Sequence, residues 1–184
     1  MSIRIRGETS ADAAAIEMVT ASAFQHATHA SHTEQHIVAA LRRAGALAVS
    51  LVAESDGRVI GHVAISPVSI SDGAPGWFGL GPIAVLPQYQ RRGTGSQLMR
   101  EALRLLRARG ACGCVVLGEP EYYGRFGFRA EPNLVLPGVP ADYFQAIRFD
   151  SSQPRGVVSY HEAFNVPYTD RSLAERGDVS EGLS

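Results

Sequence analysis

A basic turn that contains glycine, near the middle of the chain, has the residue types needed to bind an anion. An apolar run that ends near Leu86 leads into Gln90-Arg91-Arg92-Gly93-Thr94-Gly95-Ser96, and an amphipathic segment follows. Glycine lets a backbone approach a phosphate closely, and the free N–H groups and dipole of a first helical turn attract negative charge. Two adjacent arginines add planar donors. The pattern predicts a phosphate-binding turn between a strand and a helix.

Two common nucleotide-binding patterns do not fit this turn. A Walker-type loop needs a lysine that reaches the terminal phosphates, and the chain contains no lysine. A dinucleotide-binding turn has the pattern Gly-x-Gly-x-x-Gly, whereas only Gly93 and Gly95 match it and position 98 is leucine. Triphosphate hydrolysis by the first route is therefore excluded, and a dinucleotide site is disfavoured.

The turn instead resembles the Gln/Arg-x-x-Gly-x-Gly/Ala loop of the GNAT superfamily of acyl-CoA-dependent N-acetyltransferases. Residues 90–95 match this loop at every position, and residues 85–89 resemble the strand exit that precedes it. Downstream, Tyr122-Tyr123-Gly124-Arg125-Phe126-Gly127-Phe128 is similar to the family's Tyr-x-x-x-Gly-Phe segment. With residues 80–85 and 117–120 included, the chain resembles a small bacterial subgroup of predicted acetyltransferases.

This resemblance implies a fold and an activity. The fold is the α/β GNAT fold, with a mixed, mostly antiparallel sheet that is splayed at its middle and has helices on both faces. The activity is transfer of an acetyl group from acetyl-CoA, the acyl-donor substrate, to a primary amine by direct attack on the thioester. The acceptor class stays open between a small metabolite, an antibiotic, a peptide N-terminus and a protein side chain. The alternative function is a non-catalytic acyl-CoA-binding or sensor module.

The resemblance also assigns residues to the donor. The turn would hold the pyrophosphate, and the backbone before it would hold the pantetheine arm and polarise the thioester carbonyl. The cofactor-binding residues expected are Ile83, Ala84, Val85, Gln90, Arg91, Arg92, Gly93, Thr94, Gly95 and Ser96.

Acyl transfer also needs a proton donor for the leaving thiolate and a base for the amine. Tyr123 occupies the position of the family's tyrosine acid, and Tyr122, its neighbour on a helical turn, is expected to point elsewhere. Glu119 is the first candidate for the base because it follows the apolar run 115–117, at the strand end that faces the acceptor in this architecture. His161 and Glu54 are the further candidates.

Hydrophobic patterning predicts the elements that position these residues. Helices are expected over residues 10–26, from Ser31 or Thr33 to about 45, and from the turn to Gly110. Strands are expected over 3–6, 48–54, 59–67, 77–85, 113–117, 143–149 and 156–160, the last two paired with each other. Gly79, Gly81 and Pro82 predict an irregular, partly unpaired stretch within 77–85.

Composition sets the remaining expectations. A chain of 184 residues that is 45% hydrophobic fits a single domain, assigned to residues 1–168, with a polar tail over 169–184. A formal net charge of −1 argues against nucleic acid, and no apolar run approaches the ~20 residues of a membrane span. A cytoplasmic monomer or homodimer is expected.

The chain has two groups of residues that could bind a metal, one of histidines and one of cysteines. His26, His29, His32 and His36 form a cluster that is expected to be a polar bend near the acceptor entrance. Cys112 and Cys114 are expected to be core residues on one side of a strand. No metal site is predicted.

Overall fold

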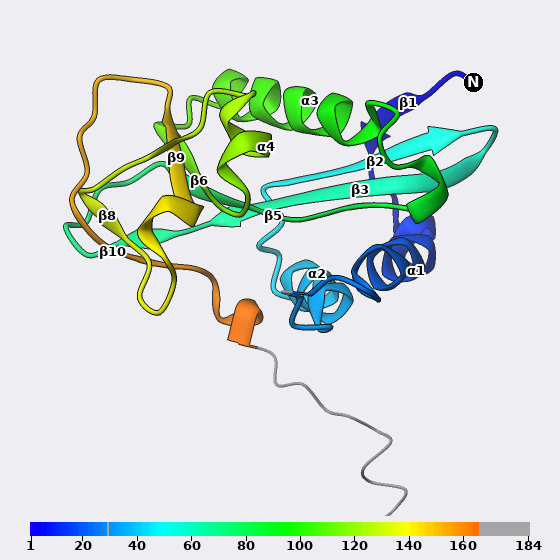
Figure 1. The fold of residues 1–184 in the computed structure, drawn as a ribbon, viewed down its shortest axis with the longest axis horizontal. Coiled ribbons are helices and arrows are strands. Elements are labelled where there is room, and N and C mark those ends of the chain that lie inside the picture. Colours follow the sequence, from blue (N-terminus) through cyan, green and yellow to red (C-terminus); the bar gives the residue numbers. More distant parts are fainter. Residues whose placement is uncertain (29, 166–184) are drawn as a thin grey trace, which may run out of the picture.

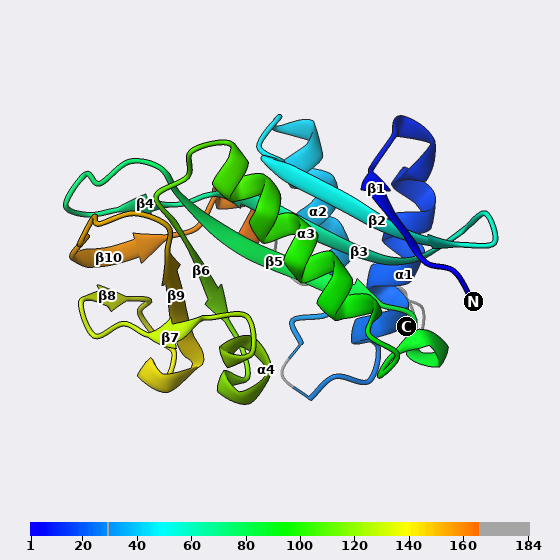
Figure 2. The same ribbon diagram turned by 90° about the horizontal axis from the view of Figure 1, so that it is seen from above.

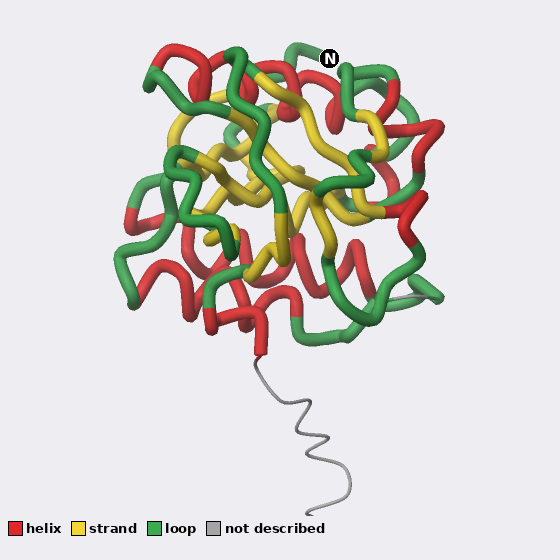
Figure 3. The backbone as a smooth tube through the Cα atoms, turned by 90° about the vertical axis from the view of Figure 1, so that its left-hand side faces the viewer, coloured by secondary structure: helices red, strands yellow, loops and turns green. Residues whose placement is uncertain are grey.

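The computed structural model describes residues 1–28 and 30–165. A sheet separates two layers of helices, with α3 (Thr94–Ala108) on one face and α1 (Ala13–Phe24) and α2 (Glu34–Arg43) on the other (Figure 1). Figure 3 shows the strands as a layer between the helices. The predicted α/β architecture with helices on both faces is confirmed. His29 and the predicted boundary and tail at 168–184 lie outside the described residues.

The main sheet has seven strands, all antiparallel to their neighbours except β5 and β6, which are parallel. Their order is β1 (Arg4–Gly7), β2 (Val49–Ser55), β3 (Arg58–Pro67), β5 (Trp77–Val85), β6 (Gly113–Leu117), β9 (Phe144–Arg148) and β7 (Arg129–Ala130). A small second sheet has the order β4 (Ser69–Ile70), β10 (Gly156–Ser159) and β8 (Leu134–Val135). The short helices are η1 (Ser10–Asp12), η2 (Pro87–Tyr89), α4 (Pro120–Gly124), η3 (Ala141–Tyr143) and η4 (Glu162–Asn165).

The predicted pairing of the last two strands with each other is wrong. β9 pairs with β6 and β7, whereas β10 pairs with β4 and β8 in the second sheet. Alternating apolar residues identify a strand, but they do not select its partner, which depends on segments far away in the sequence.

Local sequence accounts for the elements on either side of the candidate turn. The β2–β3 hairpin turns at Asp56 and Gly57, whose φ angles of 50° and 74° match the type I′ turn that suits the twist of a hairpin. α3 begins after Gly93 and buries Leu98, Ala102 and further apolar side chains against β2 and β3. The helix start and the strand before it are thus positioned by the core beneath them.

β5 and β6 diverge, and this produces the predicted splay. β5 pairs with β3 along most of its length, but it pairs with β6 only from Trp77 to Gly79. Beyond that point the two strands separate, and α4 lies at the far end of β6 (Figure 2). The ring of Tyr160 packs directly on Gly79, where any side chain would collide with it. The backbone of β5 beyond Gly79 is therefore left without a β6 partner.

The two cysteines do not share one side of the strand, which corrects the expectation for them. Cys114 belongs to the main core, whereas Cys112 packs against a smaller core that contains Trp77 and Val115. Cys112 precedes β6, so it does not continue the alternation of that strand. Within residues 1–28 and 30–165 no three His, Cys, Asp or Glu residues are grouped as metal ligands would be. No helix in those ranges is long and apolar enough to cross a membrane.

His62 is a fully buried histidine on β3. Its Nε2 lies 2.8 Å from the hydroxyl oxygen of Ser50, and its Nδ1 has no hydrogen-bond partner among the described residues. Burial, helped by the charge of Arg42, lowers the pKa of His62 to about 3. The imidazole is therefore neutral in the native protein throughout the physiological pH range.

The free energy of unfolding should consequently fall as the pH falls below about 6.5, because the unfolded chain binds a proton that native His62 does not. His62→Gln removes this proton uptake. Between about pH 7 and pH 5, the free energy of unfolding should therefore decrease by about 2 kcal/mol less in this variant than in the wild type. Urea unfolding at the two pH values measures the difference. His36→Gln, on the surface of α2, is the control and should behave as the wild type does. If the free energy of unfolding of His62→Gln decreases as much as that of the wild type, native His62 is not a neutral imidazole.

Candidate functional site

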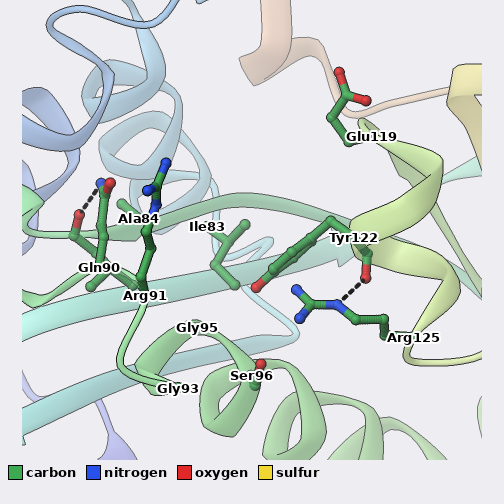
Figure 4. Close-up of a pocket in the computed structure, with 11 residues that line it drawn as sticks. Ile83, Ala84, Gln90, Arg91, Gly93, Gly95, Ser96, Glu119, Tyr122 and Arg125 are labelled. Atoms are coloured by element: carbon green, nitrogen blue, oxygen red, sulfur yellow. Dashed lines mark hydrogen bonds between the residues drawn. The ribbon is translucent and has the colours of Figure 1, made fainter.

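An open cavity of about 740 Å³ lies where the end of β5, the start of α3 and α4 meet. It is called the donor cavity below, and Figure 4 shows its lining. It is lined by Ile83, Ala84, Val85, Gln90, Arg91, Gly93, Gly95, Ser96, Glu119, Tyr122 and Arg125. Segments that are up to 42 positions apart in the sequence, as Ile83 and Arg125 are, thus face one space.

Eight of the ten residues predicted to bind the donor line this cavity, and Arg92 and Thr94 do not. The guanidinium carbon of Arg92 lies 6.0 Å from the ring centroid of Tyr89, so its side chain turns toward the surface beside η2. Thr94 is 1% exposed, and its hydroxyl has no hydrogen-bond partner among the described residues. Neither side chain lines the cavity, and the predicted contact of these two residues with the donor stays a prediction.

The geometry of the turn suits an anion. Gly93, with a φ of 84°, precedes the first turn of α3, and no side chain caps the N–H groups there. The side-chain amide of Gln90 donates to the carbonyl oxygen of Val85 over 2.9 Å, which fixes the turn to β5 (Figure 4). A Cβ atom added to Gly95 would lie 2.8 Å from the hydroxyl oxygen of Tyr122, so the space between the start of α3 and Tyr122 is narrow. Uncapped N–H groups of a long helix attract negative charge.

The charge of the donor cavity comes from two arginines and one glutamate. Arg91 reaches it from the turn, and Arg125 reaches it from the residues that follow α4. The Arg125 guanidinium lies 4.6 Å from the ring centroid of Tyr122, and its Nε donates to the carbonyl oxygen of Tyr122 over 3.3 Å. Arg125 and Tyr122 were not assigned to the donor from sequence. They are three residues apart in the Tyr-Tyr-Gly-Arg-Phe-Gly-Phe segment. That spacing places two side chains on one face of a helix and was the signal in the sequence that could have identified them.

The two tyrosines of α4 do point in different directions, as expected. Their ring centroids are 4.9 Å apart and the rings are nearly perpendicular, at 89°. It is Tyr122 that lines the donor cavity, whereas the ring of Tyr123 lies outside that lining and packs, partly buried, against the main core. Tyr123 packs directly on Gly118, and its ring centroid lies 6.0 Å from that of Phe128. The sequence motif indicated that the two rings point in different directions, but it did not indicate that Tyr122, and not Tyr123, would line the donor cavity.

Tyr123 lies close to the region in which β5 and β6 diverge. Burial raises the pKa of its phenol above the usual value. The pKa of Tyr160, whose ring packs on Gly79 of β5, is raised by burial and then by the neighbouring Cys114 thiol and Tyr123 phenol. Tyr123 therefore keeps its proton at neutral pH, near residues of both diverging strands.

Of the cavities on the side of α1 and α2, two share several wall residues with each other. The first, of about 560 Å³, is called the Tyr160 cavity and is bounded by α1, α2, β5 and the segment around Tyr160. The second, of about 750 Å³, is called the Glu119 cavity and extends from α1 to the start of α4. They share Phe24, Glu34 and Leu117. The Glu119 cavity also shares Glu119 with the donor cavity, so the three spaces form a series.

Of the three candidate bases, only Glu119 lines the donor cavity. Glu119 occupies the N-cap position of α4 without a capping hydrogen bond from its side chain, and it lines the Glu119 cavity as well. Glu54 is paired with Arg6 over 2.8 Å at the junction of β1 and β2, and Arg6 also binds Asp12. His161 accepts the backbone N–H of Ala163 at its Nδ1, over 3.0 Å. Those two side chains have structural partners and are absent from the walls of the three cavities.

Known proteins are similar to this chain in sequence and in fold. The sequence model of the Acetyltransferase (GNAT) family matches residues 12–128. An uncharacterised N-acetyltransferase of Escherichia coli K12, YhbS, is 37% identical over 169 residues, which cover 88% of this chain and 98% of YhbS. A GNAT family acetyltransferase from Brucella melitensis, solved in complex with acetyl-CoA, is 48% identical with a TM-score of 0.80, over 89% of this chain and 98% of that chain. The structure of E. coli YhbS in complex with CoA has a TM-score of 0.81 at 36% identity, over 89% and 92% of the two chains.

Proposed function

The chain belongs to the acetyltransferase (GNAT) family, and from this premise we propose that it transfers an acetyl group from acetyl-CoA to a primary amine. The observation that carries the proposal is the donor cavity, in which an uncapped helix N-terminus, two arginines and the part of β5 without a β6 partner meet. The Brucella and E. coli relatives, which were solved with acetyl-CoA and with CoA, support the same donor.

We infer one orientation of the donor from the residues of the cavity wall. The N–H groups at the start of α3, together with Arg91, would bind the pyrophosphate, and Arg125 adds a second cation. Ile83 and Val85 lie on the part of β5 that has no β6 partner, so their backbone would bind the pantetheine arm. A backbone N–H directed at the thioester oxygen would stabilise the negative charge that develops there.

The proton transfers are assigned to two residues. Tyr123 would donate its proton to the leaving thiolate, which is consistent with a buried phenol beside the diverging strands. Glu119 would accept the proton of the amine, because it lines both the donor cavity and the Glu119 cavity. The amine would then approach the thioester from the Glu119 cavity, on the side opposite to the phosphate-binding turn.

Thiol release from acetyl-CoA in the presence of a panel of primary amines tests this function. At least one amine should raise the rate well above the rate without an acceptor, and mass spectrometry should show the matching amide. Tertiary amines are the control, because they cannot form a stable amide. A protein that binds CoA but releases no thiol with any amine would instead support the non-catalytic sensor.

A further inference from the structure

Glu34, at the start of α2, is a buried carboxylate that lacks a partner on one oxygen. Its residue is 8% exposed. Oε1 accepts the backbone N–H of Ser31 over 2.8 Å and the Ser31 hydroxyl over 3.2 Å. Oε2 is buried and has no hydrogen-bond partner among the described residues. Burying a charged oxygen without a partner is unfavourable, so a hydrogen-bond donor supplied from outside the chain would stabilise this arrangement.

The cavities around Glu34 favour positive charge. Glu34 lines both the Tyr160 cavity and the Glu119 cavity, and the only charged side chains among the described residues of their walls are those of Glu34 and Glu119. The donor cavity, by contrast, contains Arg91 and Arg125. The site is therefore divided into a basic part, where a phosphate binds, and an acidic part, where a cation is favoured.

The wall between the two carboxylates is apolar. Phe24 and Leu117 line both cavities together with Glu34, and Ile37 joins them in the Tyr160 cavity. Leu117 is one of the exposed large hydrophobic residues of the chain, at 45% exposure, directly before Gly118 and Glu119. An exposed leucine in such a cleft fits a hydrocarbon segment of a ligand.

Glu119 and Glu34 lie at different distances along the series of cavities from the donor cavity, so they would contact different ends of the acceptor. Glu119 is shared with the donor cavity, and Glu34 is not. We propose that Glu34 binds a second cationic group of the acceptor, while the amine that reacts lies beside Glu119. The acceptor class is then an amine with a second protonated nitrogen, joined to the first by a hydrocarbon segment. This inference rests on the proposed function, since it places the reacting amine by the position of the donor.

Three acceptors of similar length test the inference in the wild type: hexylamine, hexamethylenediamine and ε-aminocaproate. They share the primary amine and differ at the far end, which is a methyl group, an ammonium and a carboxylate. After correction for its two reactive ends, the diamine should exceed hexylamine in kcat/KM by about tenfold or more, mainly through KM, as for a hydrogen bond to a charged group. ε-Aminocaproate should be the poorest acceptor.

Glu34→Gln tests whether this residue carries the preference. The Gln side-chain oxygen can still accept from Ser31, so the start of α2 is retained, and the ratio of diamine to hexylamine should fall to about one. Glu17→Gln removes the same charge from an exposed position on α1 and should keep the wild-type ratio. If Glu34→Gln fails to fold, the wild-type series still decides, and equal kcat/KM values for the diamine and hexylamine would overturn the inference.

Calorimetric titration of the two amines into the CoA-saturated protein separates this inference from the proposed function. If Glu34→Gln weakens diamine binding in this titration, and no amine releases thiol from acetyl-CoA in the separate activity assay, the cation site stands and the enzymatic proposal is wrong. If both amines are acetylated with no charge preference, or with a preference that Glu34→Gln retains, the enzymatic proposal stands and the cation site at Glu34 is wrong. Absence of both diamine binding and turnover would overturn the cation site.

Discussion

Tyr123→Phe is expected to lower kcat for acetyl transfer by about 10² to 10⁴, the usual effect of losing a positioned general acid. The substitution keeps the ring that packs on Gly118 and near Phe128, and removes only the hydroxyl. CoA affinity and thermal stability should therefore change little, and the loss should appear in kcat more than in the KM for acetyl-CoA. Steady-state thiol release, with an acceptor for which acyl transfer limits the rate, measures it.

Tyr122→Phe is the matched control, and it is also the competing assignment. The Tyr122 hydroxyl lies in the donor cavity beside Gly95, where an added Cβ atom would be 2.8 Å from it, so its loss is expected to alter CoA affinity moderately while kcat stays within a few-fold of the wild type. If Tyr122→Phe loses turnover and Tyr123→Phe retains it, the proton donor is the tyrosine in the cavity wall, and the assignment of Tyr123 is wrong.

Gly95→Val is expected to abolish detectable stabilisation by CoA. Gly95 lines the donor cavity inside the first turn of α3, so a larger side chain would occupy the space of the phosphate without requiring a positive φ. CoA at a hundred times its dissociation constant should stabilise the wild type by about 2.7 kcal/mol. A variant that binds a hundredfold more weakly would retain only about 0.4 kcal/mol. Thermal unfolding with and without CoA measures the difference.

Gln97→Val is the control for that experiment. It places the same β-branched side chain on α3, at an exposed position outside the lining of the donor cavity, and should keep the CoA effect. Gly93 is a less suitable target because its φ of 84° would strain any other residue and would lower stability by itself. In the wild type, NAD and ATP should stabilise far less than CoA. Equal stabilisation by all three ligands would show that the turn does not select CoA.

Features that depend on neighbouring residues could be predicted from the amino-acid sequence alone. Apolar spacing located β5 and α3, and the two glycines between them marked the turn. Asp56 and Gly57 identified the β2–β3 hairpin, because few residues adopt the positive φ angles that its turn requires. Gly79, Gly81 and Pro82 indicated that β5 would be irregular. Such features could be predicted because backbone preferences and periodicity act over a few consecutive positions.

Which distant residues come into contact depends on long-range packing and could not be predicted from local sequence. β9 and β10 are both strands, yet they belong to different sheets, because pairing depends on distant segments. Tyr122 and Tyr123 are adjacent in the sequence, and the packing of Tyr123 against Gly118 and Phe128 leaves Tyr122 as the one that lines the donor cavity. Ser31 and Glu34 match the pattern of a helix start, and that pattern carries no information on burial. Burial and cavity position arise from long-range contacts among α1, α2 and β5, so local sequence could not reveal Glu34 as a carboxylate with an unpaired oxygen.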